Sequence, residues 1–256
     1  MFTDTHSHIH FAKEFPDIDG ILARAEAAGV SRQIIVGCTP KDSFQALDFV
    51  KKYSSHNFWS TLGVHPHSSN QWNEDIEQKF EELVKSEKKI VALGEIGLDY
   101  FRNLQPKDIQ VAAFRGQLQL AKKLDLAAVV HVRDAWDDAL QVLLEEGNTR
   151  VILHCFTGNS THAKTCLDRG YFISFSGVVT YPKNEYLRDI AIAVPEDKFL
   201  IETDCPYLTP QTYRGQRNEP AYVVETAKVL AKIRGVTLPD LAKQSTRNAQ
   251  TIFRIS

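Results

Sequence analysis

Histidines alternate with other residues near the start of the chain, in the stretch MFTDTHSHIHF. Side chains alternate across a β-strand, so His6 and His8 would point the same way if this stretch is a strand. Two imidazoles side by side can hold one metal ion. His10 has the same parity but lies past the expected strand end, and we assign it to a loop or to the surroundings of the site. Alone, the pair also fits solvated or core histidines.

Further His, Glu and Asp residues occur at the ends of other short apolar runs. His131 lies in VVHVRD and His154 in VILHCF, where a histidine would be buried and would need a partner. His65, Glu95 and Asp204 end three more runs. A hydrogen-bonded core histidine explains any single case, but not the joint occurrence of these residue types. We therefore predict a metal centre among His6, His8, His65, Glu95, His131, His154 and Asp204.

The number of ligands predicts two ions. A single catalytic zinc usually has three protein ligands and a water, and four histidines with two carboxylates exceed that number. A carboxylate can bridge two ions, and mixed imidazole and carboxylate ligation suits zinc, manganese or another mid-series divalent ion. Magnesium is a further candidate, and the sequence does not choose among these ions. No GxxxxGK[ST], GxGxxG or GxSxG motif occurs, which disfavours nucleotide cofactors and a serine nucleophile. Water activated by metal is the predicted nucleophile.

Charged residues flank these candidate ligands. Arg133 follows His131 closely, and Arg214 and Arg217 lie in the polar stretch TYRGQRNEP after the eighth apolar run. Guanidinium groups can bind a phosphate with two hydrogen bonds, although most loop arginines are simply solvated. Glu202 would share a face with Asp204 and either orients a ligand histidine or is a buried structural acid.

Eight short apolar runs must position these residues. They begin with FTDTHSH and continue with RQIIVGC, FWSTLGV, KIVALGEIG, AAVVHV, RVILHCF, YFISFSG and KFLIETD. Most lack strict polar alternation, as expected of covered parallel strands, and segments with helical periodicity lie between them. Eight such units predict an α/β fold, a (β/α)8 TIM barrel forming a single domain over residues 1–256, with catalysis at the carboxyl ends of its strands. A doubly wound open sheet is the alternative, and TLPDLAKQSTRNAQTIFRI predicts an extra C-terminal helix.

Composition restricts the setting of the protein. The formal charge of the 256 residues is −2, so no overall positive field attracts polyanions or membranes. The four cysteines form no CxxC pair, which favours a reducing, cytoplasmic compartment, and Cys205 is interpreted as a small packing residue. No apolar stretch approaches the roughly 20 residues of a membrane span. The sequence does not specify the oligomeric state, and a monomer is favoured.

The ordered motifs resemble those of the TatD-type metal-dependent deoxyribonucleases, a branch of the amidohydrolase superfamily. The resemblance spans the chain through DTHSH at 4–8, GVHPH at 63–67, GEIGLDY at 94–100, VVHVRDA at 129–135, HCFTG at 154–158, ETDCPYL at 202–208 and RNEP at 217–220. It implies a (β/α)8 barrel with two divalent metal ions. The implied activity is cleavage of DNA, either 3′-to-5′ exonucleolytic or more general.

The resemblance also implies a role for each candidate. His6 and His8 would bind one ion, Glu95 would bridge both, and Asp204 would bind the first ion and accept a proton. His131 and His154 would bind the second ion, and His65 would contact a phosphate. Together with Arg133 or Arg217 as orienting groups, these roles give a phosphodiesterase with a short or terminal DNA strand as substrate.

Two other functions fit the same residues. A hydrolase of a small ester, lactone or amide would use the same ions, because the substrate pocket decides function. A metal-bearing scaffold without turnover is disfavoured because a structural zinc site is usually complete with four protein ligands.

Overall fold

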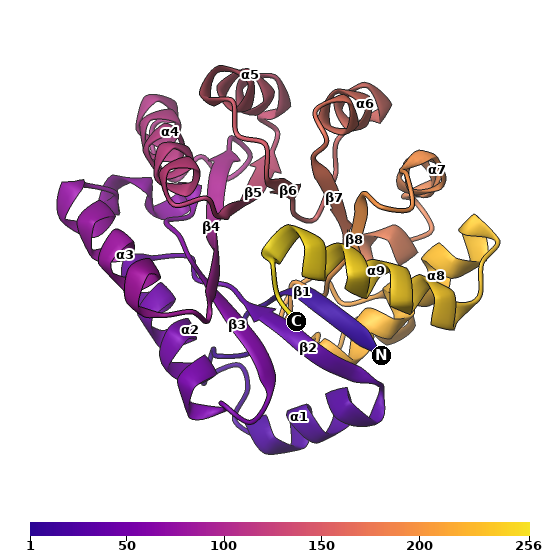
Figure 1. Cartoon of the computed structure of the whole chain (residues 1–256). Helices are drawn as coiled ribbons and strands as arrows, with labels where there is room; N and C mark the ends of the chain where they lie inside the picture. Colours follow the sequence, from indigo (N-terminus) through magenta and orange to yellow (C-terminus); the bar gives the residue numbers. More distant parts are fainter.

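A computed structural model describes residues 1–256, in which eight strands alternate with helices (Figure 1). The strands are Phe2–Ser7 (β1), Val30–Ile35 (β2), Asn57–Leu62 (β3), Ile90–Asp99 (β4), Ala127–Arg133 (β5), Val151–Leu153 (β6), Phe172–Phe175 (β7) and Phe199–Ile201 (β8). The α-helices are Ile18–Ala27 (α1), Pro40–Lys52 (α2), Glu74–Ser86 (α3), Lys107–Lys123 (α4), Trp136–Glu146 (α5), Ser160–Asp168 (α6), Glu185–Ala193 (α7), Val223–Arg234 (α8) and Leu238–Phe253 (α9). Four short 3₁₀ turns are Pro66–Gln71, Gly177–Thr180, Gln211–Tyr213 and Pro220–Tyr222.

The strands are parallel neighbours in the order β1 to β8, and β1 returns to the end of β8. A parallel bridge joins Ser7 to Cys205, and the His8 amide donates to the Cys205 carbonyl at 2.9 Å. The Asp204 amide donates to the His6 carbonyl, also at 2.9 Å. The predicted (β/α)8 barrel is therefore confirmed, and the doubly wound open sheet is excluded.

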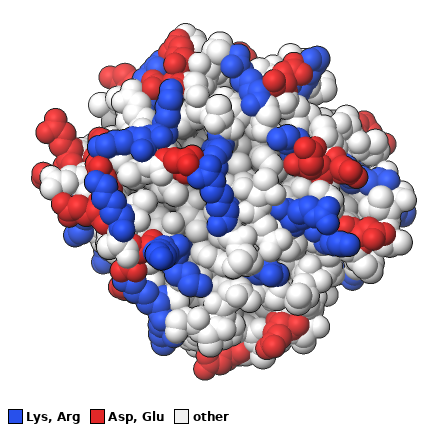
Figure 2. Space-filling view, in the orientation of Figure 1, with Lys and Arg blue, Asp and Glu red and all other residues white.

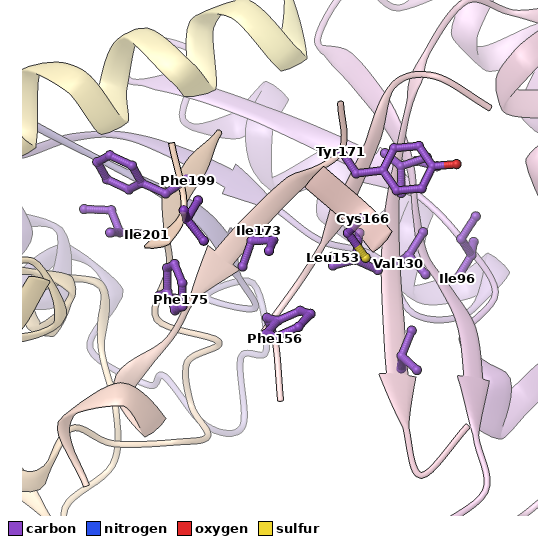
Figure 3. Packing of buried hydrophobic residues seen from close by; sticks show 14 of the residues in the cluster. Ile96, Val130, Leu153, Phe156, Cys166, Tyr171, Ile173, Phe175, Phe199 and Ile201 are labelled. Atoms are coloured by element: carbon purple, nitrogen blue, oxygen red, sulfur yellow. The ribbon is translucent and has the colours of Figure 1, made fainter. Parts of the chain in front are cut away.

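Side chains alternate between the barrel interior and the surrounding helices. Ile173 and Phe175 of β7 and Phe199 and Ile201 of β8 belong to the large cluster that the strands form with the helices (Figure 3). Phe172 and Leu200, with the opposite parity, belong to a separate interior cluster. This alternation is why covered parallel strands read as nearly continuous apolar runs.

Helix α9 closes the amino-terminal end of the barrel. Thr237 caps its first turn by accepting a hydrogen bond from the Asp240 amide at 3.2 Å. Its last turn places Ala249, Ile252 and Phe253 in the interior cluster, against residues near the strand starts. Figure 1 shows α9 crossing this end of the strands, which confirms the predicted extra helix.

The face that carries α9 has mixed charge. Lys and Arg side chains are interspersed with Asp and Glu across it, without a continuous field of either sign (Figure 2). No helix of the chain combines the length and the apolar character needed to cross a membrane.

Candidate metal centre

The six predicted ligands converge at the carboxyl ends of the strands. They come from β1, β4 and β5 and from the residues just after β1, β6 and β8: His6, His8, Glu95, His131, His154 and Asp204. The strands β6 and β8 are only three residues long, so His154 and Asp204 lie beyond them. No side chain of the six is more than 18% exposed.

Glu95 occupies the centre of the cluster. Its Oε1 lies 2.9 Å from Nδ1 of His131 and 3.1 Å from Nε2 of His154. Its Oε2 lies 3.5 Å from Nε2 of His6. The two oxygens of one carboxylate therefore face different histidines.

The second group surrounds the end of β1. Nε2 of His6 and Nε2 of His8 are 3.2 Å apart. Asp204 directs its Oδ1 toward both, at 3.4 Å from His8 and 3.6 Å from His6. Two imidazole nitrogens and a carboxylate oxygen thus converge on one point, as expected for metal ligands.

The donor atoms fit divalent ions of the zinc type. Ligand atoms of His6, His8 and Asp204 lie within 4.8 Å of one another, and so do those of His6, Glu95 and His154. Imidazole nitrogens and carboxylate oxygens suit zinc and manganese, and no lysine or arginine forms an ion pair with the six predicted ligands. Nδ1 of the buried His6 has no hydrogen-bond partner in the protein. The cluster therefore has the donor groups that a divalent metal ion needs.

Groups outside the cluster fix the orientation of the ligand histidines. Glu202 Oε1 lies 2.9 Å from Nδ1 of His154 and accepts a hydrogen bond from the Cys155 amide at 2.7 Å. Nδ1 of His8 donates to the Val36 carbonyl at 3.0 Å. Metal-bound imidazoles usually need such a partner on the second nitrogen. Of the two interpretations of Glu202, the structure favours the orienting role.

Asp99 is a partner that the sequence analysis missed. Its Oδ2 lies 3.3 Å from Nε2 of His131 and 2.8 Å from Nε2 of His67, while its Oδ1 accepts a hydrogen bond from the Arg102 amide. Asp99 has the parity of Glu95 within GEIGLDY, so the alternation of the strand could have identified it. Cys38, whose thiol lies 3.4 Å from Glu95 Oε2, was also missed, and no spacing motif marks it.

A glycine allows β4 to pass close to β5 at this point. Gly97 has a φ of 137°, and a Cβ there would collide with the carbonyl oxygen of His131. Only glycine adopts this backbone conformation readily. The β4–β5 register is irregular between Leu93 and Ile96, next to Glu95.

Electrostatic interactions oppose the cost of burying these groups. Burial disfavours ionisation of Glu95, but the surrounding His65, His154 and His131 outweigh it and hold its pKa well below the usual range. Burial likewise disfavours a charged His154, yet Glu202 and Glu95 raise its pKa well above normal. For Asp204, the hydrogen bond from His8 and the neighbouring histidines overcome burial and lower the pKa. Both carboxylates are therefore ionised and available as ligands.

His65 is held as a neutral donor beside the cluster. Burial lowers its pKa to about 3, and its Nδ1 accepts a hydrogen bond from the His67 amide at 3.1 Å. The ring proton therefore resides on Nε2, which lies 3.5 Å from Glu95 Oε1. This geometry suits a hydrogen-bond donor to substrate.

The arginines differ in how closely they approach the cluster. Arg133 is exposed and places its guanidinium 3.8 Å from the centre of the Phe101 ring. Arg217 donates to the backbone carbonyl of Glu14 and pairs with its carboxylate at 3.4 Å. Arg214 stacks on Tyr181 at 4.4 Å. Only Arg133 belongs to a strand that carries a ligand histidine.

Comparisons with known proteins agree with this geometry. The family model of TatD related DNases matches residues 3–254. The chain is 37% identical over 258 residues to a Bacillus subtilis protein named as an uncharacterized metal-dependent hydrolase, YabD, with all of both chains covered. It is 39% identical to the Salmonella typhimurium 3′-5′ ssDNA/RNA exonuclease TatD, covering 96% of this chain and 95% of that protein.

Solved structures give the same result. The crystal structure of the Escherichia coli TatD homologue YJJV superposes with a TM-score of 0.92 at 29% identity, covering 100% of this chain and 98% of the other. A TatD family hydrolase from Entamoeba histolytica gives 0.88 at 26% identity, covering 98% and 97%. The chain belongs to the family of TatD related DNases and is a metal-dependent hydrolase.

Proposed function

We propose that this hydrolase is a phosphodiesterase that removes nucleotides from the 3′ end of a DNA strand with two divalent metal ions. One observation carries the proposal: Glu95 directs one carboxylate oxygen toward His131 and His154 and the other toward His6. This arrangement supports two adjacent ions bridged by one carboxylate. The name of the Salmonella relative supports a nucleic-acid strand as substrate.

Each predicted ligand has a place in this proposal. His6, His8 and Asp204 would hold one ion, His131 and His154 the other, and Glu95 both. When bound, the ions supply Lewis acidity and lower the pKa of a bound water, which is the chemistry that phosphodiester hydrolysis needs. Zinc, manganese and magnesium are the candidates.

Asp204 is the proposed proton acceptor. Its pKa is lowered despite its burial, so it is ionised at neutral pH and can take the proton of the attacking water. It lies beside His8 and is 14% exposed, so its carboxylate borders the open end of the barrel. The same residue would thus bind an ion and receive a proton.

His65 and Arg133 are the proposed phosphate contacts. Nε2 of His65 carries its ring proton toward the cluster, and Arg133 stands at the end of β5, two residues after His131. Arg217 could join them only after leaving Glu14, so we assign it a smaller contribution. Two divalent ions would supply the local positive charge that a chain of net charge −2 lacks.

The proposed setting is a monomeric enzyme in the cytoplasm acting on short or terminal DNA strands. All four cysteines are free thiols, which supports a reducing compartment.

The test uses metal-stripped protein with a labelled single-stranded and a 3′-recessed oligonucleotide. Magnesium, manganese or zinc is added separately, with Glu95→Ala as the inactive variant and Glu82→Ala, an exposed acid of α3, as matched control. We expect mononucleotides to appear with at least one ion, in the wild type and Glu82→Ala but not in Glu95→Ala. An active Glu95→Ala protein would remove the bridging assignment. No release with any ion, together with turnover of small esters, lactones or amides, would replace the proposal by the small-molecule hydrolase.

A further inference from the structure

Two exposed aromatic rings stand at the open end of the barrel. Phe101 is 57% exposed and follows the end of β4, and Tyr207 is 55% exposed and follows β8. Single exposed apolar side chains are common on protein surfaces, so it is the position of these two rings, not their exposure, that carries information. Both belong to loops after the carboxyl ends of strands, which is the end of the barrel that holds the ligand cluster.

Each ring lies beside one half of the ligand cluster. The Tyr207 ring centre is 6.3 Å from that of His8, in an edge-on arrangement. Phe101 follows Asp99, which contacts His131, and the guanidinium of Arg133 covers one face of the Phe101 ring at 3.8 Å. One ring therefore borders the His6 and His8 group, and the other borders the His131 group.

The two rings lie on opposite sides of the barrel. In the strand order β1 to β8, which closes from β8 to β1, the end of β4 lies across the ring from the end of β8 (Figure 1). Glu95 and the ligand histidines lie between them. A linear polymer with one phosphate at the cluster would therefore lie beside one ring on one side of that phosphate and beside the other ring on the other side.

The chemistry of the rings favours nucleobases as their partners. Every base has a flat π-face that stacks on an aromatic side chain, whatever its sequence. The guanidinium of Arg133 lies over the Phe101 ring at 3.8 Å, so the pair offers both a ring for a base and a positive charge for a phosphate. Two separate rings with a polar cluster between them do not form the continuous apolar patch that a protein partner would need.

We propose that Tyr207 and the Phe101–Arg133 pair are two base-stacking positions, one on each side of the phosphodiester that is cut. This inference rests on the proposed phosphodiesterase function and specifies its substrate: a strand in which the two nucleotides flanking the cut are unpaired. In a duplex both faces of each base are already covered by neighbours. Selection of unpaired ends therefore follows from the two rings and does not require recognition of the sequence.

The experiment compares the metal-loaded wild type with Phe101→Ala and Tyr207→Ala. The substrates are a fluorescent single-stranded 12-mer, the same 12-mer with abasic sites at its two 3′ nucleotides, and a blunt duplex. Tyr207→Phe retains the ring, and Ile192→Ala removes an exposed apolar side chain of α7 and serves as matched control. Both KM and kcat are measured, and fluorescence anisotropy gives the affinity of each 12-mer in the same buffers.

We expect each alanine variant to bind the base-bearing 12-mer at least about fivefold more weakly and to raise its KM similarly. The abasic 12-mer should bind the wild type and the variants equally. Tyr207→Phe should retain most of the affinity that Tyr207→Ala loses, and Ile192→Ala should behave as wild type. Equal binding of the two 12-mers by the wild type would overturn the stacking proposal, as would alanine variants that bind like the wild type.

The two proposals fail in different ways. Unchanged variants in an enzyme that releases nucleotides would remove the stacking positions and leave the phosphodiesterase. An enzyme that releases no nucleotides with any ion would remove the phosphodiesterase, and the anisotropy comparison would still decide whether the rings bind bases.

Discussion

The two ends of the barrel interior contrast sharply, although the same strands build both. Near the strand starts the interior is apolar, with Phe172 and Leu200 packed against Phe253 of α9. Two residues after Leu200, just past the end of β8, the chain has Glu202. The transition from apolar core to ionised site therefore occurs within a single step of the strand alternation.

The two ends of the barrel therefore contribute differently to the free energy of unfolding. The apolar end gains free energy by removing hydrocarbon from water. The other end buries ionisable groups, whose desolvation cost is met by their mutual pairing and by the ions that we expect there. We therefore expect changes at the apolar end to lower the free energy of unfolding, and changes at the polar end to alter metal binding and turnover.

The largest effect on stability is expected at the apolar end. Phe253→Ala leaves a cavity among the interior residues that α9 closes, because the Phe253 side chain is only 2% exposed. Truncation of a buried phenylalanine costs about 3–5 kcal/mol, which denaturant unfolding would measure. Leu144→Ala, at a 51% exposed position of α5, is the control and should change little. If Phe253→Ala changed the metal affinity as strongly as it changed the stability, the two ends of the barrel would not be energetically separate.

Metal binding at the polar end should stabilise the folded state. At 100 times its dissociation constant, an ion that binds only the folded state adds about 2.7 kcal/mol to the free energy of unfolding. Thermal unfolding with increasing zinc should therefore shift upward in the wild type. His6→Ala should lose most of this shift, whereas His56→Ala, at an exposed histidine, should keep it. A shift that survived His6→Ala would place the ion elsewhere.

Glu202→Gln should have a smaller effect, confined to the polar end. Glutamine can still accept the hydrogen bond from His154, but the negative charge that supports this imidazole is removed. Partners of this kind change metal affinity by about 10- to 100-fold, which titration against a chelator would measure. Glu196→Gln, an exposed position before β8, is the control. Unchanged affinity would make Glu202 a structural acid.

Asp4 should affect stability only through its dependence on pH. Burial raises the pKa of its carboxyl from the ordinary 3.8 to about 7, and the hydrogen bonds from Thr203 oppose this rise only in part. Between about pH 4 and pH 7 the folded protein therefore holds more protons at this site than the unfolded chain. The contribution of Asp4 to the free energy of unfolding must fall with rising pH in that window, by at most about 1.4 kcal/mol per pH unit.

The comparison of wild type with Asp4→Asn isolates this contribution. The stability of the wild type relative to Asp4→Asn should decrease from pH 4 to pH 7 and become constant above it. Urea unfolding at several pH values would measure the difference. A difference independent of pH would show that Asp4 is ionised throughout.

The positions of the candidate ligands were predictable because parallel strands present their carboxyl ends at one edge. His131 and His154 each ended an apolar run, and this was sufficient to expect them together. The groups that contact the second nitrogen of the ligand histidines were harder to predict. The Val36 carbonyl and Asp99 meet their histidines through the register of neighbouring strands, which the residue pattern of one strand does not contain.

Loop conformation explains the remaining differences. Arg217 lies near the candidate ligands in sequence, but its guanidinium binds Glu14, which belongs to the long loop after β1. Nothing in the sequence pairs these two residues. The short extent of β6 and β8 likewise depends on where neighbouring strands stop pairing.

The closure of the barrel has a consequence for the order of events during synthesis. β1 is made first, yet it rests on residues made last: Thr3 bonds to Thr246 of α9, and the His8 amide bonds to Cys205. A ribosome-bound chain that stops before β8 therefore has no partner for one edge of its first strand. His6 and His8 would acquire their metal-binding geometry only after the emergence of the last strand and helix. The nascent chain would thus be unable to hydrolyse a substrate before its last strand has been translated.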